Sequence, residues 1–453
     1  MIGQRSSWRS SAGRRYAVSV PAAAVVVATL VLSGCTSSGK SGSTSGSSAS
    51  GGGAGSSASS NSAAANTGAV TDLVAYTRGS AKAADASLKP VTLGWVNQQG
   101  GPLEFPNSTV GAQAAVKYVN TYLGGIGGHP LKLDTCYVVG NEQEGNTCGL
   151  QLVNNADVTA VLFGTVLVGD QSFQAVDAGK KPILMANSIN VTDASGKNVF
   201  IFNGNPMSFF GGVAAYVHSV LKAKTVSTIY PQDSQSIGGV AALKAALASV
   251  GITLKSVGFD PSTTNLTAAA LAAGAQTADV VLPLVSTPPS CVAAAKAITS
   301  LGIKAPVISL GSFCFGAPVA QGLGGSAPKW TQVASQTNVL DSSEPDVGAY
   351  LADSAKVGLG AAVQTDSNAA LAWSLVMTAA RFLNGGGGAQ ATATAIATQA
   401  GAFTGPLLLG SATVKCGTNP AAPGLCGAQM RAFQHLGGNN YKAVSDWLNP
   451  VGP

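Results

Sequence analysis

From Val91 onward, short apolar stretches of the sequence alternate with segments of helical spacing. Strand-like stretches lie at Val91–Val96, Leu131–Val138 and Val158–Phe163, and a helical repeat of apolar residues runs from Thr109 to Leu123. The same alternation continues in a second half that begins near residue 205. This pattern predicts strands joined by helical crossovers, which is the parallel α/β class. It extends over about 360 residues, more than one open sheet with a single core usually holds, so we expect two α/β lobes.

The N-terminus has the order of an export signal. Four arginines precede an apolar stretch that begins near residue 17 and closes with Leu-Ser-Gly-Cys at residues 32–35. The stretch is short for a membrane span, which needs ~20 apolar residues. Its end resembles the bacterial lipobox, in which the chain is cut before the cysteine and the cysteine is acylated. The resemblance implies a lipoprotein signal peptide at residues 1–34 and a lipidated Cys35. An ordinary export signal with an incidental cysteine is the alternative, and Arg14-Arg15 leaves twin-arginine export open.

Residues 36–67 are almost wholly Ser, Gly, Ala, Asn and Thr. A segment of this composition cannot bury enough apolar area to offset the entropy lost on ordering. We therefore expect residues 35–70 to hold the lipidated cysteine and a disordered tether with a reach on the order of 30 Å.

Charge and cysteine content limit the function further. Removing residues 1–34 leaves 21 basic and 19 acidic residues, and no Lys/Arg cluster indicates a nucleic-acid partner.

The six cysteines beyond Cys35 form three pairs close in sequence, and in an exported chain this spacing favours sequential disulfides: Cys136–Cys148, Cys291–Cys314 and Cys416–Cys426. We expect no metal site, because no Cys-x-x-Cys occurs and the chain has only three histidines. No catalytic constellation or cofactor motif stands out, so we do not expect an enzyme.

One segment carries a specific family resemblance. Residues 115–133 read AVKYVNTYLGGIGGHPLKL, which resembles the first helix, glycine turn and second strand of type I periplasmic binding proteins of the Leu/Ile/Val-binding-like branch. The stretches at 159–164, 181–185, 226–239, 403–407 and 441–448 resemble later elements of that family in the same order. The resemblance implies two Rossmann-like lobes with parallel sheets joined by a three-strand hinge. The expected crossings lie near 203–206, 335–338 and 405–410. They divide the chain into lobe 1 (90–204 plus 337–405) and lobe 2 (205–336 plus 406–453).

The resemblance also implies a function. It predicts an extracytoplasmic solute-binding lipoprotein that captures a small polar solute and delivers it to the permease subunits of an ABC importer. The solute classes it implies are amino acids, amides or urea, and small carboxylates. The expected location is the outer face of the cytoplasmic membrane, held there by the lipid on Cys35. A membrane-tethered sensor or envelope receptor that is not coupled to transport is the alternative.

Ligands of open parallel sheets bind beyond the carboxyl ends of the strands. The loops expected there are rich in amides, hydroxyls and glycines, which suit a neutral or singly anionic solute. The loop at 164–170 is apolar where family members carry hydroxyls, and the loops at 286–290 and 311–315 hold no acid for an ammonium group. We therefore expect amides or simple carboxylates to bind better than leucine. For Asn187 and Asn190, the alternative to contacting the solute is a role in a turn. For Gln98, the alternative is a solvated side chain. The candidate ligand-binding residues are Asn97, Gln98, Val168, Gly169, Asn187, Ser188, Ile189, Asn190, Ser236, Ser286 and Ser312.

Overall fold

The computed structural model describes residues 68–101, 103–309 and 311–451, all of which fall in one compact unit of the chain. The expected signal peptide, Cys35 and most of the expected tether lie outside the described residues. The last three tether positions, residues 68–70, are described, and Val70 is buried in the first hydrophobic core. In the described part of the chain, no helix combines the length and apolar character that a membrane crossing requires.

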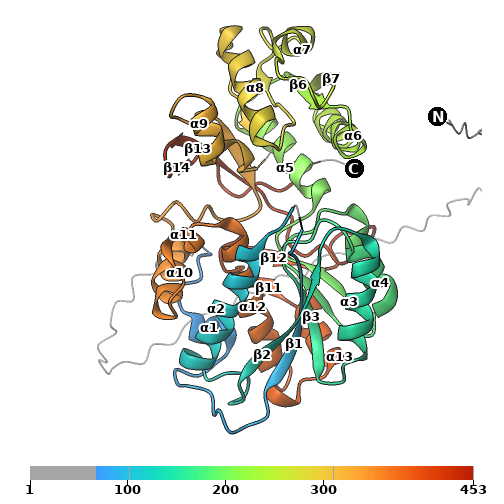
Figure 1. The fold of residues 1–453 in the computed structure, drawn as a ribbon, viewed down its shortest axis with the longest axis vertical. Coiled ribbons are helices and arrows are strands. Elements are labelled where there is room, and N and C mark those ends of the chain that lie inside the picture. The colour runs from blue at the N-terminus through green and yellow to red at the C-terminus, as the bar shows by residue number, and fades with distance from the viewer. Residues whose placement is uncertain (1–67, 102, 310, 452–453) are drawn as a thin grey trace, which may run out of the picture. The chain divides into compact units, whose positions relative to one another are not determined.

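The first lobe is built on a five-stranded parallel sheet in the order β2-β1-β3-β4-β5 (Figure 1). Helices α2 and α12 pack on one face, where Leu93 and Trp95 of β1 contribute to the largest core cluster. Helices α3 and α4 pack on the other face, over Val96 and Phe163. The strands are β1 (Val91–Gln98), β2 (Leu131–Val138), β3 (Val158–Phe163), β4 (Ile183–Met185) and β5 (Val199–Ile201), and the helices are α2 (Pro106–Tyr122), α3 (Glu142–Asn154), α4 (Asp170–Asp177) and α12 (Ser367–Gly385).

The second lobe has a mixed sheet. Strands β7-β6-β8 continue through a parallel bridge between Val281 and Val307 into β9 and β10, and β13 and β14 add an antiparallel edge. The expected parallel sheet is confirmed for its first five strands, and the closing hairpin is an addition to it. The strands are β6 (Thr225–Pro231), β7 (Thr253–Phe259), β8 (Val280–Val281), β9 (Ile308–Ser309), β10 (Thr331–Ala334), β13 (Arg431–Gly437) and β14 (Asn440–Ala443), and the helices are α5 (Pro206–Ser219), α6 (Ser234–Ser249), α7 (Thr267–Ala272), α8 (Pro288–Ser300) and α9 (Ala317–Gly322).

The remaining elements are short or connect the lobes. They are α1 (Leu73–Thr77), η1 (Val191–Ser195), η2 (Phe313–Phe315), α10 (Pro345–Lys356), α11 (Ala361–Gln364), η3 (Gly388–Gln390), α13 (Ala393–Gly401), β11 (Thr404–Gly405) and β12 (Val414–Lys415).

The chain passes between the two sets of cores three times. Phe202 belongs to a first-lobe core and Phe210 to a second-lobe core, and the chain returns between Val333 and Val339. The third crossing differs from the expectation. Residues 407–426 pack with the first lobe, and the change to a second-lobe core comes only at Met430. The physical reason is the apolar run at 407–409, whose leucines are buried in the α12 core.

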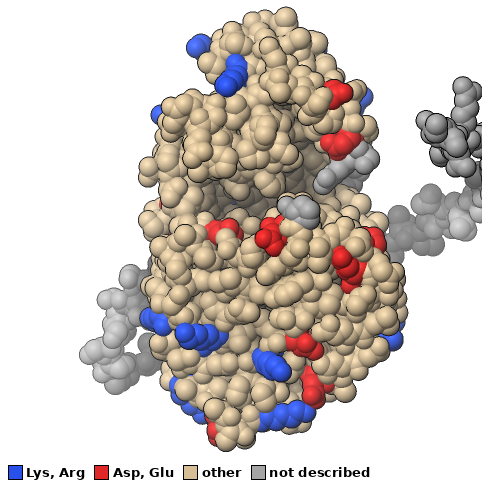
Figure 2. All heavy atoms as spheres, in the orientation of Figure 1, with Lys and Arg blue, Asp and Glu red and all other residues tan. Residues whose placement is uncertain are grey.

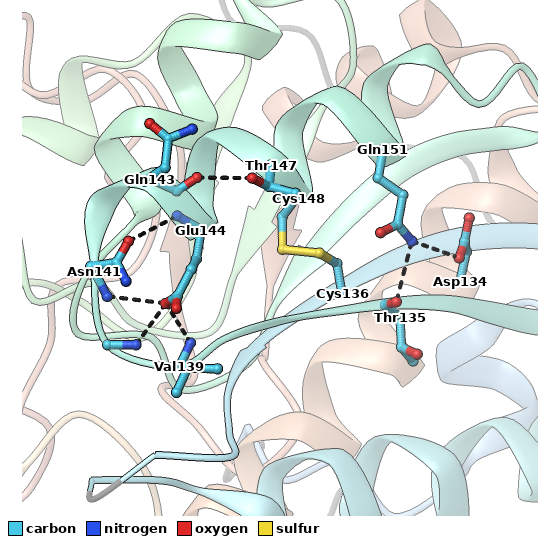
Figure 3. Close-up of a disulfide and its surroundings, with 11 residues drawn as sticks. Asp134, Thr135, Cys136, Val139, Asn141, Gln143, Glu144, Thr147, Cys148 and Gln151 are labelled. Atoms are coloured by element: carbon cyan, nitrogen blue, oxygen red, sulfur yellow. Dashed lines mark hydrogen bonds between the residues drawn. A yellow bond between two sulfur atoms is a disulfide. The ribbon is translucent and has the colours of Figure 1, made fainter.

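All three expected disulfides are present. Cys136 of β2 is bonded to Cys148 of α3, which ties an edge strand to the helix that follows it (Figure 3). Cys291 of α8 is bonded to Cys314 of η2, and Cys416 is bonded to Cys426. The sequential pairing is therefore confirmed.

Candidate functional site

Asn97 and Gln98 are the last two residues of β1, and Ser236 lies in the first turn of α6. The other candidate residues lie in the segments that follow β3, β4, β8 and β9. Figure 2 shows a hollow on the surface of the compact unit, bordered by acidic side chains. The candidate residues differ in how much of their polar surface remains free.

Asn97 and Gln98, at the end of β1, hold two loops together. The buried Asn97 side chain donates from Nδ2 to the Phe105 carbonyl oxygen at 2.9 Å and accepts from the Thr165 amide at 3.0 Å. Gln98 accepts from the Leu167 amide at 2.9 Å and donates to the Leu103 carbonyl at 3.1 Å. Both amides thus join the loop after β1 to the loop after β3. Their polar atoms are occupied by protein groups, so they position the loops.

The loop that follows β3 is pinned to α3. Gly169 has φ 90°, and its amide donates to the Glu142 carboxylate at 3.0 Å. Gly145 of α3 faces the Gly169 backbone so closely that an added Cβ would overlap the Gly169 carbonyl. Val168, the other candidate in this loop, is half-buried. The approach of α3 therefore requires glycine at both contact positions.

The loop that follows β4 is built around a buried hydroxyl. Ser188 donates to the Asn190 carbonyl at 2.7 Å and also bonds the Asp193 carboxylate. Asn190 donates from Nδ2 to Asp170 Oδ2 at 2.7 Å. Asn187 is exposed and Ile189 is half-buried. Ser188 and Asn190 therefore organise the loop, while Asn187 offers a free amide.

Two buried acids, Asp170 and Asp193, lie behind this loop, and the sequence analysis did not single them out. They are 2% and 1% exposed, and Asp193 accepts from Gln171 and from Gln174, the latter at 2.6 Å. Burial, and then the neighbouring Asp170 carboxylate, raise the pKa of Asp193 to about 7. Asp170 Oδ1 has no hydrogen-bond partner. The sequence contained a signal for both acids, because Asp170 and Asp193 follow two successive predicted strands.

The second-lobe candidates are more open. Ser286 follows β8 and Ser312 follows β9, and both are exposed. Ser236 is half-buried, and Asp233 caps helix α6 by accepting from the Ser236 amide at 2.8 Å. Phe313, beside Ser312, is 54% exposed and was also not singled out. This lobe therefore presents hydroxyls and one aromatic ring.

The fold and these strand-end loops define a two-lobed α/β binding protein. The family model described as "Periplasmic binding protein" matches residues 90–431, most of the chain. The protein therefore belongs to the periplasmic binding protein family, and the resemblance drawn from residues 115–133 is confirmed. A search of the curated proteins found no match.

Solved structures similar to this chain show the same fold. A solute-binding protein of an ABC transporter from R. palustris, in complex with 4-hydroxybenzoate, has a TM-score of 0.60 and 14% identity, covering 80% of this chain and 96% of that one. The branched-chain amino acid transporter substrate-binding protein LivJ from Streptococcus pneumoniae, in complex with isoleucine, has a TM-score of 0.60 and 17% identity, covering 80% of this chain and 100% of that one. A fatty acid ABC transporter substrate-binding protein from Thermomonospora curvata has a TM-score of 0.59 and 14% identity, covering 82% and 95%.

Proposed function

We propose that the protein captures a small solute between its two lobes and delivers it to the permease subunits of an ABC importer. The observation that carries this proposal is that two lobes, each with its own parallel strands and its own cores, are linked by three chain crossings. Such crossings can act as hinges that let two lobes close on a ligand. The descriptions of the similar structures, which include ABC transporter solute-binding proteins, support the same reading.

The candidate contacts divide into two groups. Asn187, Ser286 and Ser312 have exposed polar groups that could meet a solute directly. The others, Asn97, Gln98, Ser188 and Asn190 among them, set the shape of the loops. Amide, hydroxyl and backbone groups of this kind fit the proposed classes of amino acids, amides or urea, and small carboxylates.

Solute capture is tested by combining a thermal-shift screen with small-angle scattering on the full chain. A solute that binds only the folded protein raises the melting temperature by mass action. We expect at least one amino acid, amide or small carboxylate to do so and to reduce the radius of gyration. If no solute in a broad panel produces either change, the proposed function is wrong.

We further propose that Cys35 carries a lipid that anchors the protein outside the cytoplasmic membrane. The lipobox-like sequence at residues 32–35 and the membership in a family of exported proteins support this. The variant Cys35→Ala should move from the detergent phase to the aqueous phase in phase partitioning, because its anchor is lost. Cys35→Ala protein that stays in the detergent phase would contradict the anchor.

A further inference from the structure

His435 lies in β13, in the antiparallel edge that closes the second lobe, and its side chain is fully buried. Its Nδ1 lies 2.7 Å from the Pro328 carbonyl oxygen, and its Nε2 lies 2.9 Å from the Gly438 carbonyl oxygen. The first contact reaches the segment between α9 and β10, and the second reaches the turn between β13 and β14. One imidazole ring therefore joins three parts of the second lobe.

The sequence of the turn explains how the second contact forms. Gly437 and Gly438 have φ values of 116° and 58°, which glycine adopts readily. Asn440 donates from Nδ2 to the Gly437 carbonyl oxygen at 3.1 Å, and the register of the two strands shifts between His435 and Gly437. The tight turn brings the Gly438 carbonyl back to the ring three residues earlier.

Both partners of the ring are hydrogen-bond acceptors. A carbonyl oxygen has no proton to donate, so each contact needs an N–H group on the imidazole. A neutral imidazole has one N–H, whereas the imidazolium has two. In a neutral ring, one nitrogen lone pair would face a carbonyl oxygen at 2.7 or 2.9 Å with no proton between them. The two contacts therefore require the protonated ring.

Two aromatic rings accommodate the positive charge. The centroid of the Phe315 ring in η2 lies 4.9 Å from that of His435, and the centroid of the Tyr441 ring in β14 lies at 5.0 Å. Aromatic faces attract a cation at such distances. Burial raises the pKa of Tyr441 to about 12, so its hydroxyl group stays neutral beside the ring.

No acidic side chain of the surrounding elements holds the proton in place. Residues 288–334 and 431–443 form η2, β10, β14 and the segments around the ring, and they contain no Asp or Glu. The salt bridges of the described residues do not include His435. The charge is therefore held by two hydrogen bonds and depends on the pH. The other charged groups of these two stretches are all basic: Lys296, Lys304, Lys329, Arg431 and Lys442.

Loss of the proton would leave one carbonyl without a donor. Pro328 is half-buried and Gly438 is exposed, so water can replace the ring more easily at Gly438. The neutral ring would then keep its bond to Pro328 and release the turn. The effect would extend along the lobe, because β13 begins directly after the third crossing at Met430 and Phe315 follows the loop that contains Ser312.

We propose that His435 is a proton-dependent lock: its imidazolium holds the β13–β14 hairpin to the rest of the second lobe, and loss of the proton releases the turn. Histidine side chains change charge in the range of about pH 5 to pH 8. The stability that the protonated ring gives to the hairpin is complete at low pH and is lost as the ring gives up its proton. The lock goes beyond the proposed function and does not depend on it.

Nitrogen-15 NMR on the full chain, labelled only at histidine, tests the protonation of the ring. The chain has three histidines, and the variants His435→Gln and His218→Gln assign their signals. At about pH 6 we expect both ring nitrogens of His435 to carry a proton, and at about pH 9 we expect one of them to be bare. A neutral His435 ring at about pH 6 overturns the inference.

Hydrogen exchange tests whether this proton locks the hairpin. Protection factors correct for the intrinsic effect of pH on exchange. Those of the β13–β14 amides should fall at least about tenfold between about pH 6 and about pH 9, relative to those of β6 in the same lobe. The comparison with β6 removes changes in overall stability, including any caused by Asp193. A hairpin whose protection does not fall, or falls only as much as that of β6, overturns the inference.

The variant His435→Gln separates the proton from the shape of the site. Its amide group donates at one end only and does not titrate, so hairpin protection should be low at about pH 6 and should not change up to about pH 9. His218→Gln, at an exposed position in the last turn of α5, is the matched control and should keep the wild-type response. A full wild-type response in His435→Gln overturns the inference, and the wild-type measurements decide alone if this variant does not fold.

Discussion

At the scale of single residues, the pair of Asp170 and Asp193 is the most informative feature. Two buried carboxyl groups without a positive partner cannot both ionise at low cost. Burial, followed by the Asp170 charge, raises the pKa of Asp193 to about 7. The folded chain therefore holds a proton between about pH 4 and pH 7 that the unfolded chain releases. The stability that this proton provides is complete below about pH 4 and is lost as the pH rises through about 7.

The variant Asp193→Asn should remove this pH dependence. An amide keeps the acceptor for Gln171 and Gln174 and can donate towards Asp170 without a titrating proton. Each pKa unit corresponds to about 1.4 kcal/mol of free energy. The free energy of unfolding of the variant should therefore exceed that of wild type by up to a few kcal/mol between pH 5 and pH 8. Chemical denaturation across this range measures the difference, with Asp446→Asn as the exposed control. Parallel curves for wild type and Asp193→Asn would show that Asp193 is ionised at all these pH values.

The sequence predicted the candidate loops but not how their side chains are used. Asn97 and Gln98 directly follow the predicted strand Val91–Val96, which makes them candidate solute contacts. Their amides instead join two loops, which depends on the distance between segments about 70 residues apart. The contact between Asn190 and Asp170 likewise requires that β3 and β4 are neighbours. Side-chain partners of this kind follow from sheet register, which composition and periodicity do not contain.

At the scale of elements, long apolar strands were predictable and the end of the chain was not. Leu131–Val138 and Val158–Phe163 were expected and are found as β2 and β3, because alternating apolar stretches and helical repeats are local signals. The third crossing was placed about 20 residues too early. Leu407–Leu409 could have been buried in either lobe, and only packing against α12 decides in favour of the first.

The contact between α3 and α4 gives a prediction at this scale. A methyl group at Gly145 would overlap the Gly169 carbonyl, whereas one at Gly238 of α6 meets no atom within 4 Å. Gly145→Ala should therefore cost about 1–3 kcal/mol through overpacking and displace the loop after β3. Gly238→Ala should add about 0.5–1 kcal/mol, since alanine favours a helix. Denaturant titration of both variants measures this, and a stabilised Gly145→Ala protein would disprove the close contact.

At the scale of the whole molecule, each lobe has its own cores. Two clusters belong to the first sheet and two to the second. Contacts that link the lobes include the ion pair between Arg431 of β13 and Glu344 at the start of α10, at 2.8 Å. Separate cores joined by a few crossings can unfold as separate cooperative units. A solute held by both lobes would couple these units.

We therefore expect two calorimetric unfolding transitions without solute and one transition at saturating solute. Leu93 in the first sheet and Leu243 in α6 are fully buried probes of the two lobes. Each change to Ala should cost about 2–5 kcal/mol and lower the transition of its own lobe alone. With bound solute, each variant should shift the single merged transition, because binding energy now depends on both lobes being folded. If Leu243→Ala lowers every transition equally in the absence of solute, the lobes fold as one unit, and solute binding cannot be what couples them.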